Sequence, residues 1–167
     1  MGSPGDALRE AVQGASPQLR GISETRSAAR PPSGGWSPRE ILGHLIDSAA
    51  NNHRRFVLAQ IQDELVFPGY EQEAWVRLQQ YQGEPWAALI NLWEAYNLHL
   101  AHVMTAAPEG ARTRPREKHG LDAIAFRAVP SDQPATLEWL MEDYVDHLRH
   151  HLGQIRNAVA DDPGGMR

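Results

Sequence analysis

The chain has 167 residues, of which 41% are hydrophobic and 22% are charged, a balance typical of a globular domain. Its formal net charge of −5 argues against a nucleic-acid partner, because proteins that bind nucleic acids carry basic patches. There is no cysteine, which excludes disulfides, thiolate metal ligands and a cysteine nucleophile. Metal chemistry would therefore use the eight histidines and the carboxylates, and the length predicts one domain over residues 1–167.

No stretch is apolar over the length needed to cross a bilayer, and the N-terminus lacks the apolar segment of a signal peptide. We therefore expect no membrane partner and a cytoplasmic location. Because the chain has no thiol of its own, any thiol chemistry would need a small-molecule thiol from outside.

The first predicted helix covers about residues 5–29. Residues 7–12 favour a helix, and Leu19 and Ile22 continue the apolar line. Pro17 interrupts this pattern, which predicts a kink or a break with a restart after Ser16. Paired prolines and glycines at 31–35 then form a connection.

The second predicted helix, residues 38–62, has a well-specified start. Ser37 suits the N-cap, Pro38 suits the first helical position, and Glu40 completes a capping box. His44 follows in the second turn beside an apolar face and is a candidate metal ligand. A polar sector continues from it: Asp47, Ser48, Asn51, Asn52 and Arg55. This sector is either a solvated face or the polar wall of a cavity.

The link at 63–84 is longer than a tight helix pair needs, so we expect it to cross the end of a bundle. It contains a predicted short helix at about 71–81. Its aromatic side chains, Tyr70, Trp75 and Tyr81, either cover a pocket or close the core.

The third predicted helix covers residues 85–107. Asn97 falls at a core-facing position and needs a hydrogen-bond partner, either in a cavity or on a neighbouring helix. His99 and His102 are three residues apart and could share an ion. We rank this pair low, because His102 lies near a helix C-terminus, where a cation is favourable without any metal.

The link at 108–134 is basic, with Arg112, Arg114, Arg116 and Lys118. It is either a solvated loop or, if it lies near a functional site, a region that attracts an anionic substrate. The absence of clear periodicity over this length is typical of a functional or poorly ordered loop.

The fourth predicted helix covers residues 135–160, followed by a terminating tail at 161–165. His147 and His151 are four residues apart, so their rings share one helix face, and Gln154 follows one turn later. They are either satisfied core residues or metal ligands, and the second interpretation needs a third ligand on another helix. Four long helices with two long links predict an all-α, four-helix bundle with crossover connections.

A set of motifs in this sequence resembles the DinB-like superfamily. They are Trp36-Ser37-Pro38-Arg39-Glu40, Gly43-His44-Leu45 and the distant His147-x-x-x-His151-x-x-Gln154. Residues 47–56 and 69–76 are also similar to one bacterial branch, and the resemblance covers about residues 36–155. It implies a four-helix bundle with one divalent metal ion on His44, His147 and His151. Some members of this superfamily transfer small thiols such as bacillithiol or mycothiol.

Three neutral imidazoles bind zinc or nickel well and leave coordination positions open, as in a catalytic site. An open position can activate water or hold an external thiol as a thiolate. The resemblance favours transfer of a small-molecule thiol to an electrophilic substrate; the alternatives are a metal-dependent hydrolase or a non-catalytic metal-binding bundle. Bundles of this superfamily also form homodimers, which makes a homodimer an expectation here.

Further residues around this predicted site are candidates for substrate binding and proton transfer. The candidate substrate contacts are Asn51, Asn97 and Tyr70. No general base is evident: the candidates are Asp47, Asp143 and Asp146. Asp143 lies four residues before His147, so it either orients that ring or faces solvent.

Overall fold

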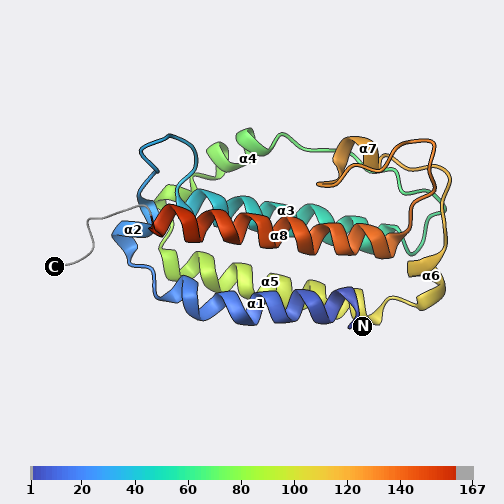
Figure 1. Cartoon of the computed structure of the whole chain (residues 1–167), viewed down its shortest axis with the longest axis horizontal. Coiled ribbons are helices and arrows are strands. Elements are labelled where there is room, and N and C mark those ends of the chain that lie inside the picture. Colours follow the sequence, from blue (N-terminus) through green and yellow to red (C-terminus); the bar gives the residue numbers. More distant parts are fainter. Residues whose placement is uncertain (1, 161–167) are drawn as a thin grey trace.

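The structure, a computed structural model, describes residues 2–160, and this range contains helices but no β-strand (Figure 1). The helices are α1 (Pro4–Arg20), α2 (Glu24–Ala28), α3 (Pro38–Leu58), α4 (Gln72–Gln79), the 3-10 turn η1 (Tyr81–Gly83), α5 (Trp86–Ala106), α6 (Glu109–Thr113), α7 (Leu121–Ile124) and α8 (Leu137–Ala160). The all-α prediction is confirmed, while the predicted tail at 161–165 lies outside the described residues. Within 2–160, no helix has the length and apolar character that crossing a membrane requires.

Four long helices form the bundle. Both α1 and α3 pack against α5 and α8, so the order around the bundle is α1, α5, α3, α8. Figure 1 shows that α3 and α5 run in one direction and that α1 and α8 run in the other. In this order, α1 and α3 lie diagonally across the bundle, as do α5 and α8. The connections from α1 to α3 and from α5 to α8 therefore cross from one corner of the bundle to the other. This arrangement confirms the predicted four-helix bundle with crossover connections.

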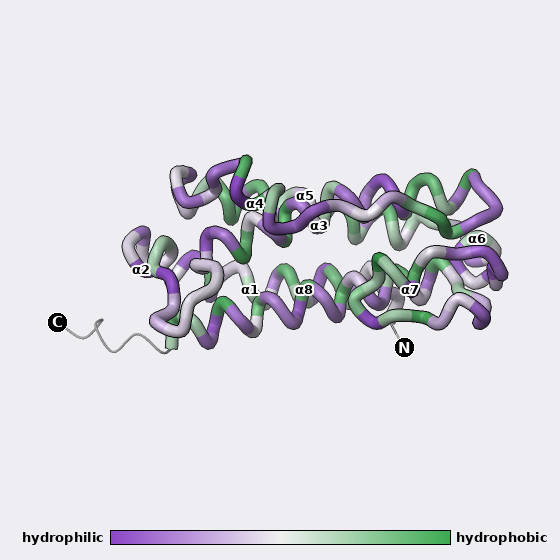
Figure 2. The backbone as a smooth tube through the Cα atoms, turned by 90° about the horizontal axis from the view of Figure 1, so that it is seen from above, coloured by the Kyte–Doolittle hydropathy of each residue, from purple (hydrophilic) through white to green (hydrophobic). Residues whose placement is uncertain are grey.

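The link between α3 and α5 differs from its prediction. It does not cross the end of the bundle but runs back along α3, with α4 over that helix, while α7 lies over α8 (Figures 1 and 2). The reason is the parallel course of α3 and α5, since the chain must return to the end where α3 begins. This return places residues 65–81 against one side of α3.

The first predicted helix is two helices, α1 and α2. The helix continues through Pro17, where we predicted a kink or break, and ends at Gly21. A proline costs one backbone hydrogen bond, but the following turn still closes, because the Gly21 N–H donates to the carbonyls of Pro17 and Gln18, each at 3.2 Å. A new helix then begins at Ser23, whose hydroxyl accepts from the Arg26 N–H at 3.2 Å.

The start of α3 follows the sequence prediction. The Ser37 hydroxyl accepts from the Glu40 N–H at 3.2 Å, and the Glu40 carboxylate accepts from the Ser37 N–H at 2.9 Å. These two bonds are a complete capping box. They fix the first turn of α3, and with it the position of His44 one turn later.

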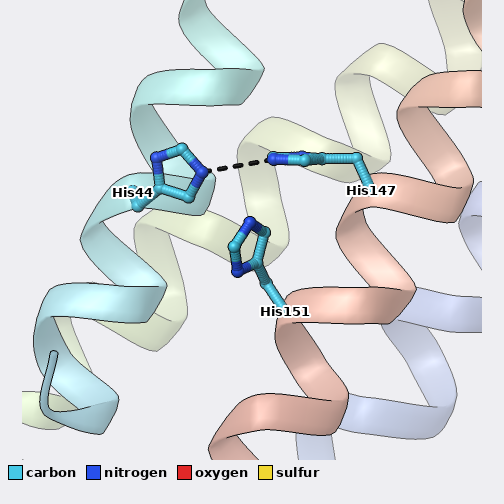
Figure 3. A group of neighbouring side chains, drawn as sticks. All are labelled: His44, His147 and His151. Carbon is cyan, nitrogen blue, oxygen red and sulfur yellow. Dashed lines mark hydrogen bonds between the residues drawn. The ribbon is translucent and has the colours of Figure 1, made fainter. Parts of the chain in front are cut away.

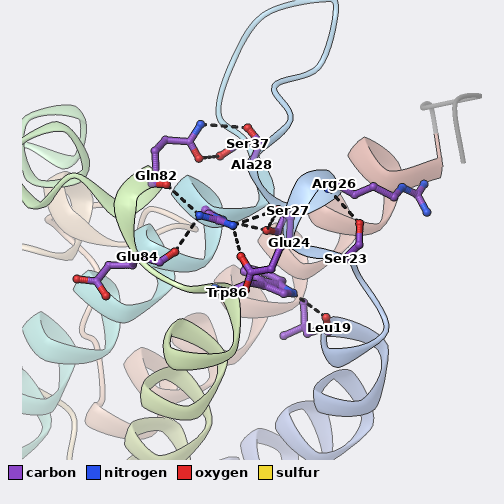
Figure 4. Close-up of polar contacts among 11 residues, drawn as sticks. Leu19, Ser23, Glu24, Arg26, Ser27, Ala28, Ser37, Gln82, Glu84 and Trp86 are labelled. Atoms are coloured by element: carbon purple, nitrogen blue, oxygen red, sulfur yellow. Dashed lines mark hydrogen bonds and ion pairs between the residues drawn. The ribbon is translucent and has the colours of Figure 1, made fainter.

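A polar junction ties three segments together at this end of the bundle. Arg39 donates to the carbonyls of Gln82 and Glu84, both at 2.9 Å, and also pairs with Glu24 of α2. Figure 4 shows these partners around the start of α5, where the Trp86 indole donates to the Leu19 carbonyl. The junction holds α2, α3 and the η1 turn in register, which positions the residues that follow.

The basic link lies at the other end of α3. Arg114 pairs with Asp63, Lys118 pairs with Glu64, and buried Arg116 donates to the Ala59 carbonyl. At about 1.5 Å per helical residue, this end of α3 is roughly 20 Å from His44. These three basic side chains therefore stabilise that end of the bundle and lie away from the histidines, whereas residues 123–126 of the same link line a cavity beside His147.

Gly43 permits a close approach between α3 and η1. A Cβ atom at this position would lie 2.1 to 2.5 Å from ring atoms of Tyr81. Tyr81 is buried, and its hydroxyl donates to Asp47 Oδ1 at 2.6 Å, so the ring has little freedom to move. The glycine beside His44 is thus required by packing.

We expect Gly43→Ala to destabilise the protein by about 1–3 kcal/mol, because an overpacked core must shift or adopt strained rotamers. Urea unfolding followed by circular dichroism measures this change. Gly153→Ala in α8 is the matched control, since a Cβ atom there would meet only the far end of the Arg156 side chain, with Nη2 at 3.7 Å. It should be neutral or stabilising, as alanine favours a helix over glycine. Equal stability of the two variants would contradict the packing argument.

Candidate metal centre

Three histidines converge between α3 and α8. His44 projects from α3, and His147 and His151 project from consecutive turns of α8 (Figure 3). The ring centroids are 5.1 Å apart for His44 and His147, 4.7 Å for His44 and His151, and 4.5 Å for His147 and His151. One nitrogen from each ring lies within 4.8 Å of the others. The third ligand that the helical pair requires is thus present on another helix.

The spacing of the ring nitrogens fits a metal ion. Nε2 of His44 and Nε2 of His147 are 3.2 Å apart. Two nitrogens that each lie about 2.0–2.1 Å from a tetrahedral ion are separated by about 3.3 Å. Among residues 2–160, this is the one group of three or more histidine or carboxylate side chains that meets such a criterion. The residues present therefore fit a divalent ion.

Burial keeps these imidazoles neutral. Removal from water, together with proximity to His151, lowers the pKa of His44 to about 4. Burial also lowers the pKa of His147 to about 3, with added repulsion from His151, His44 and His150. The pKa of His151 is lowered by burial, although its hydrogen bond to Gln154 acts in the opposite direction. Neutral rings keep the lone pairs that a metal ion needs.

Hydrogen bonds select the nitrogen that each of the two α8 rings presents. Nδ1 of His151 lies 2.7 Å from Oε1 of Gln154, which only accepts, so Nδ1 carries the proton and Nε2 stays free. Nδ1 of His147 lies 3.5 Å from the Ser48 hydroxyl, which leaves its Nε2 facing His44. Such partners orient metal-binding histidines and set their tautomers. Nδ1 of His44 is buried without a partner among the described residues.

We expect Gln154→Ala to weaken metal binding by roughly 10- to 100-fold, because His151 loses the partner that fixes its tautomer. Competition with a chromophoric chelator measures this affinity. Asn157→Ala is the matched control, since Asn157 is exposed one turn further along α8. Unchanged affinity in Gln154→Ala would show that this hydrogen bond does not orient the ring.

Two cavities share His151 in their walls. The larger, about 1060 Å³, is lined by His151 and Gln154 from α8 together with Trp36 and Arg77. The smaller, about 350 Å³, is lined by both His147 and His151. The smaller volume is within the range of small-molecule sites, about 300–1,000 Å³, and the larger lies just above it. His151 lies at the boundary of the two cavities, so two molecules could approach the same centre from different sides.

Comparison with known sequences decides the family. The sequence model of the DinB superfamily matches residues 7–155. The chain belongs to the DinB superfamily. This finding confirms the resemblance seen in the sequence motifs.

Two relatives of this DinB chain carry names that refer to metal. "Putative metal-dependent hydrolase YfiT" of Bacillus subtilis is 28% identical over 123 residues, which are 73% of this chain. "Putative metal-dependent hydrolase OB0413" of Oceanobacillus iheyensis is 24% identical over 131 residues, which are 78% of this chain. The chain spans 63% of the first relative and 69% of the second.

A solved structure of Bacillus subtilis YfiT, described as an unusual four-helix bundle topology, has the same fold as the DinB chain. The two structures superpose with a TM-score of 0.75 over 94% of this chain and 84% of the other. Their sequence identity over this superposition is 18%. The likeness supports the bundle topology described above.

The predicted substrate contacts fall in three different places in this DinB bundle. Tyr70 lines the smaller cavity. Asn51 is half-buried and donates to the Asp47 carbonyl at 2.9 Å, and it is not among the residues that line either cavity. Asn97 is fully buried in the core: it donates to the Trp93 carbonyl at 2.8 Å and accepts from the Tyr144 hydroxyl at 2.5 Å. Substrate contact stays a prediction for all three.

The candidate general bases are engaged elsewhere. Asp47 is buried, and its Oδ1 accepts from Tyr81 and Gln79, while Oδ2 has no partner among the described residues. The Asp143 carboxylate does not bond to His147 but accepts from the N–H groups of Phe126 and Arg127 at 2.8 and 2.7 Å.

Asp146, the third candidate, pairs with Arg127 at 3.2 Å. The Asp143 bonds hold residues 123–126, which line the smaller cavity. The sequence signal for this wall is the short apolar run Ala123-Ile124-Ala125-Phe126 within an otherwise polar link.

The other candidate pair, His99 and His102, stacks at a centroid distance of 6.3 Å on the exposed side of α5. His53 of α3 lies 5.1 Å from His99, and its Nδ1 is 3.1 Å from the Tyr96 hydroxyl. These three histidines do not meet the distance criterion that His44, His147 and His151 satisfy. The ranking made from the sequence therefore agrees with the geometry.

Proposed function

We propose that this protein is a divalent-metal-dependent enzyme that transfers a small-molecule thiol to an electrophilic substrate at His44, His147 and His151. The observation that carries the proposal is the position of His151, which lines both cavities beside the converging nitrogens. A transfer reaction brings two molecules to one centre, and two cavities provide room for them. Hydrolysis needs only one organic substrate.

A bound zinc or nickel ion would favour the thiolate form of a coordinated thiol. The chain supplies the surroundings for this chemistry. The three imidazoles are neutral and donate lone pairs, Gln154 holds the His151 proton on Nδ1, and Trp36 covers the His44 ring at a centroid distance of 5.1 Å. Trp36 and Phe126, which lies 5.5 Å from the His147 ring, limit the access of water to the centre.

The second candidate function is a metal-dependent hydrolase at the same residues. The names of the relatives from Bacillus subtilis and Oceanobacillus iheyensis favour it. Hydrolysis would need water activated near the histidines. The carboxylate that lines the smaller cavity with His147, Asp143, already accepts from two backbone N–H groups on its two oxygens. We therefore rank hydrolysis below thiol transfer.

Parallel assays of the zinc- and nickel-loaded protein separate the two functions. One follows alkylation of cysteine, N-acetylcysteine, bacillithiol and mycothiol by a bromobimane, and the other follows p-nitrophenyl acetate hydrolysis without thiol. The proposal predicts metal-dependent turnover above background only with a thiol. Metal-dependent ester cleavage without a thiol would instead support the hydrolase. A cytoplasmic location and a homodimer stay predictions.

A further inference from the structure

Arg55 is a buried cation that lacks an acidic partner. The residue belongs to α3, lines the smaller cavity and is 6% exposed. It donates to Asn52 Oδ1 at 3.4 Å and to the Pro68 carbonyl at 3.2 Å, and no carboxylate of residues 2–160 forms an ion pair with it. Arginines are rarely buried unless they are paired. The positive charge of the guanidinium therefore has no acidic partner in the described residues, and several of its N–H groups have no acceptor there.

Three other arginines of the bundle pair with carboxylates, whereas Arg116, also buried, bonds to the backbone carbonyls of Ala59 and Ala111. Arg39 pairs with Glu24, Arg112 pairs with Glu138, and Arg127 pairs with Asp143. Burial lowers the pKa of Arg55, because removal from water disfavours its charged form. A cost of this kind is offset when an anion binds. The fold thus keeps Arg55 in a position that an anion from outside the chain would stabilise.

The smaller cavity gives such an anion a place to bind. Arg55 lines it together with Tyr70, Ser48 and Asn52. Burial raises the pKa of Tyr70 to about 12, so its hydroxyl stays neutral and can donate a hydrogen bond. The carboxylate already in this wall, Asp143, accepts from the Phe126 and Arg127 N–H groups and does not contact Arg55.

A continuous set of contacts connects Arg55 to the metal centre. Asn52 lies between Arg55 and Ser48, with its Nδ2 3.3 Å from the Ser48 hydroxyl, and that hydroxyl is 3.5 Å from Nδ1 of His147. Ser48 and Arg55 are separated by about 10 Å along the helix axis. A molecule of several bonds' length could therefore reach both the arginine and the histidines.

We propose that Arg55 and Tyr70 bind a carboxylate group of the substrate in the smaller cavity, so that the molecule presented to the three histidines is anionic. The planar guanidinium matches a carboxylate with two parallel hydrogen bonds. This inference rests on the proposed function for the identity of the centre, but carboxylate binding can be measured without turnover.

The test is a titration followed in the arginine Nε–Hε region of the ¹H–¹⁵N NMR spectrum. The probe is glutarate, and its uncharged diamide is the control ligand. Both the metal-loaded and the chelator-treated protein are used, because a carboxylate could also bind an ion directly. We expect a saturable shift of the Arg55 signal with glutarate, none with the diamide, and the same result after metal removal.

Variants then assign the binding. Arg55→Gln should weaken glutarate binding by roughly 10- to 100-fold, as loss of a charge-assisted hydrogen bond predicts. Arg54→Gln removes the same charge from the exposed neighbouring position and should change nothing. Tyr70→Phe should weaken binding by roughly 2- to 10-fold and keeps the test valid if Arg55→Gln fails to fold.

Equal affinity of wild type, Arg55→Gln and Tyr70→Phe would overturn the proposal, as would binding that disappears with the metal. Absence of saturable glutarate binding by the wild type would also overturn it. Failure of the proposed function has a different signature: no metal-dependent turnover, with carboxylate binding at Arg55 retained. The two inferences can therefore fail independently.

Discussion

Replacement of His147 by alanine is expected to reduce bound zinc or nickel from about one ion per chain to near zero after dialysis. His147 supplies one of three nitrogens that converge within 4.8 Å, and its Nε2 lies 3.2 Å from that of His44. Two remaining imidazoles form a much weaker site. Elemental analysis of protein reconstituted with each ion measures the occupancy.

The same variant should lose the stabilisation that the ion provides. A ligand that binds only the folded state raises the melting temperature of the wild type, so a chelator should lower it. His147→Ala should melt at one temperature with or without chelator. His102→Ala is the matched control, because it removes an exposed histidine of α5. Full occupancy in His147→Ala, or loss of metal in His102→Ala, would contradict the assignment.

Asn97→Ala is expected to destabilise the protein by about 3 kcal/mol. The buried Tyr144 hydroxyl would lose its acceptor at 2.5 Å, and a small void would form beside Trp93. For a chain of this size, the melting temperature should fall by about 6–12 °C. Differential scanning calorimetry of the metal-loaded protein measures this change.

Two further variants test whether the loss comes from the hydrogen bond between Asn97 and Tyr144. Asn91 lies on the exposed side of the same helix, so Asn91→Ala should change the free energy of unfolding by less than about 0.5 kcal/mol. The double variant Asn97→Leu with Tyr144→Phe replaces both polar partners by apolar groups and should recover part of the loss. If Asn97→Ala has the same melting temperature as the wild type, the Asn97 side chain is not the structural link between α5 and α8 that the hydrogen bonds indicate.

Local sequence signals were enough to predict the long helices. The capping box at Ser37 and Glu40 set the start of α3, and the apolar stripe around His147 and His151 set the face of α8. The predicted kink or break at Pro17 was wrong, because the loss of one backbone hydrogen bond did not outweigh the packing of α1 against α5. The break instead follows Arg20, where Ser23 begins the next helix.

The candidate site needed more than local signals. The i, i+4 spacing predicted that His147 and His151 share a face, and the helix start at Ser37 made His44 a candidate ligand. Only the family resemblance joined His44 to this pair, which lies about 100 residues away in the sequence. Asn97 shows the limit of periodicity, which marks a core-facing polar residue without indicating whether its partner is a ligand or Tyr144. The meeting of Arg55 and Tyr70 depends on the return of the link along α3, which we had expected to cross the end of the bundle.

Anomalous diffraction from crystals of the metal-loaded protein, measured at the absorption edge of the bound ion, locates the ion relative to the three histidines. If these histidines hold the ion, we expect one peak per chain between α3 and α8, about 2.0–2.2 Å from one nitrogen each of His44, His147 and His151. We also expect the peak to border both cavities. A peak at His53, His99 or His102 instead, or no peak between the three rings at full metal loading, would contradict this assignment.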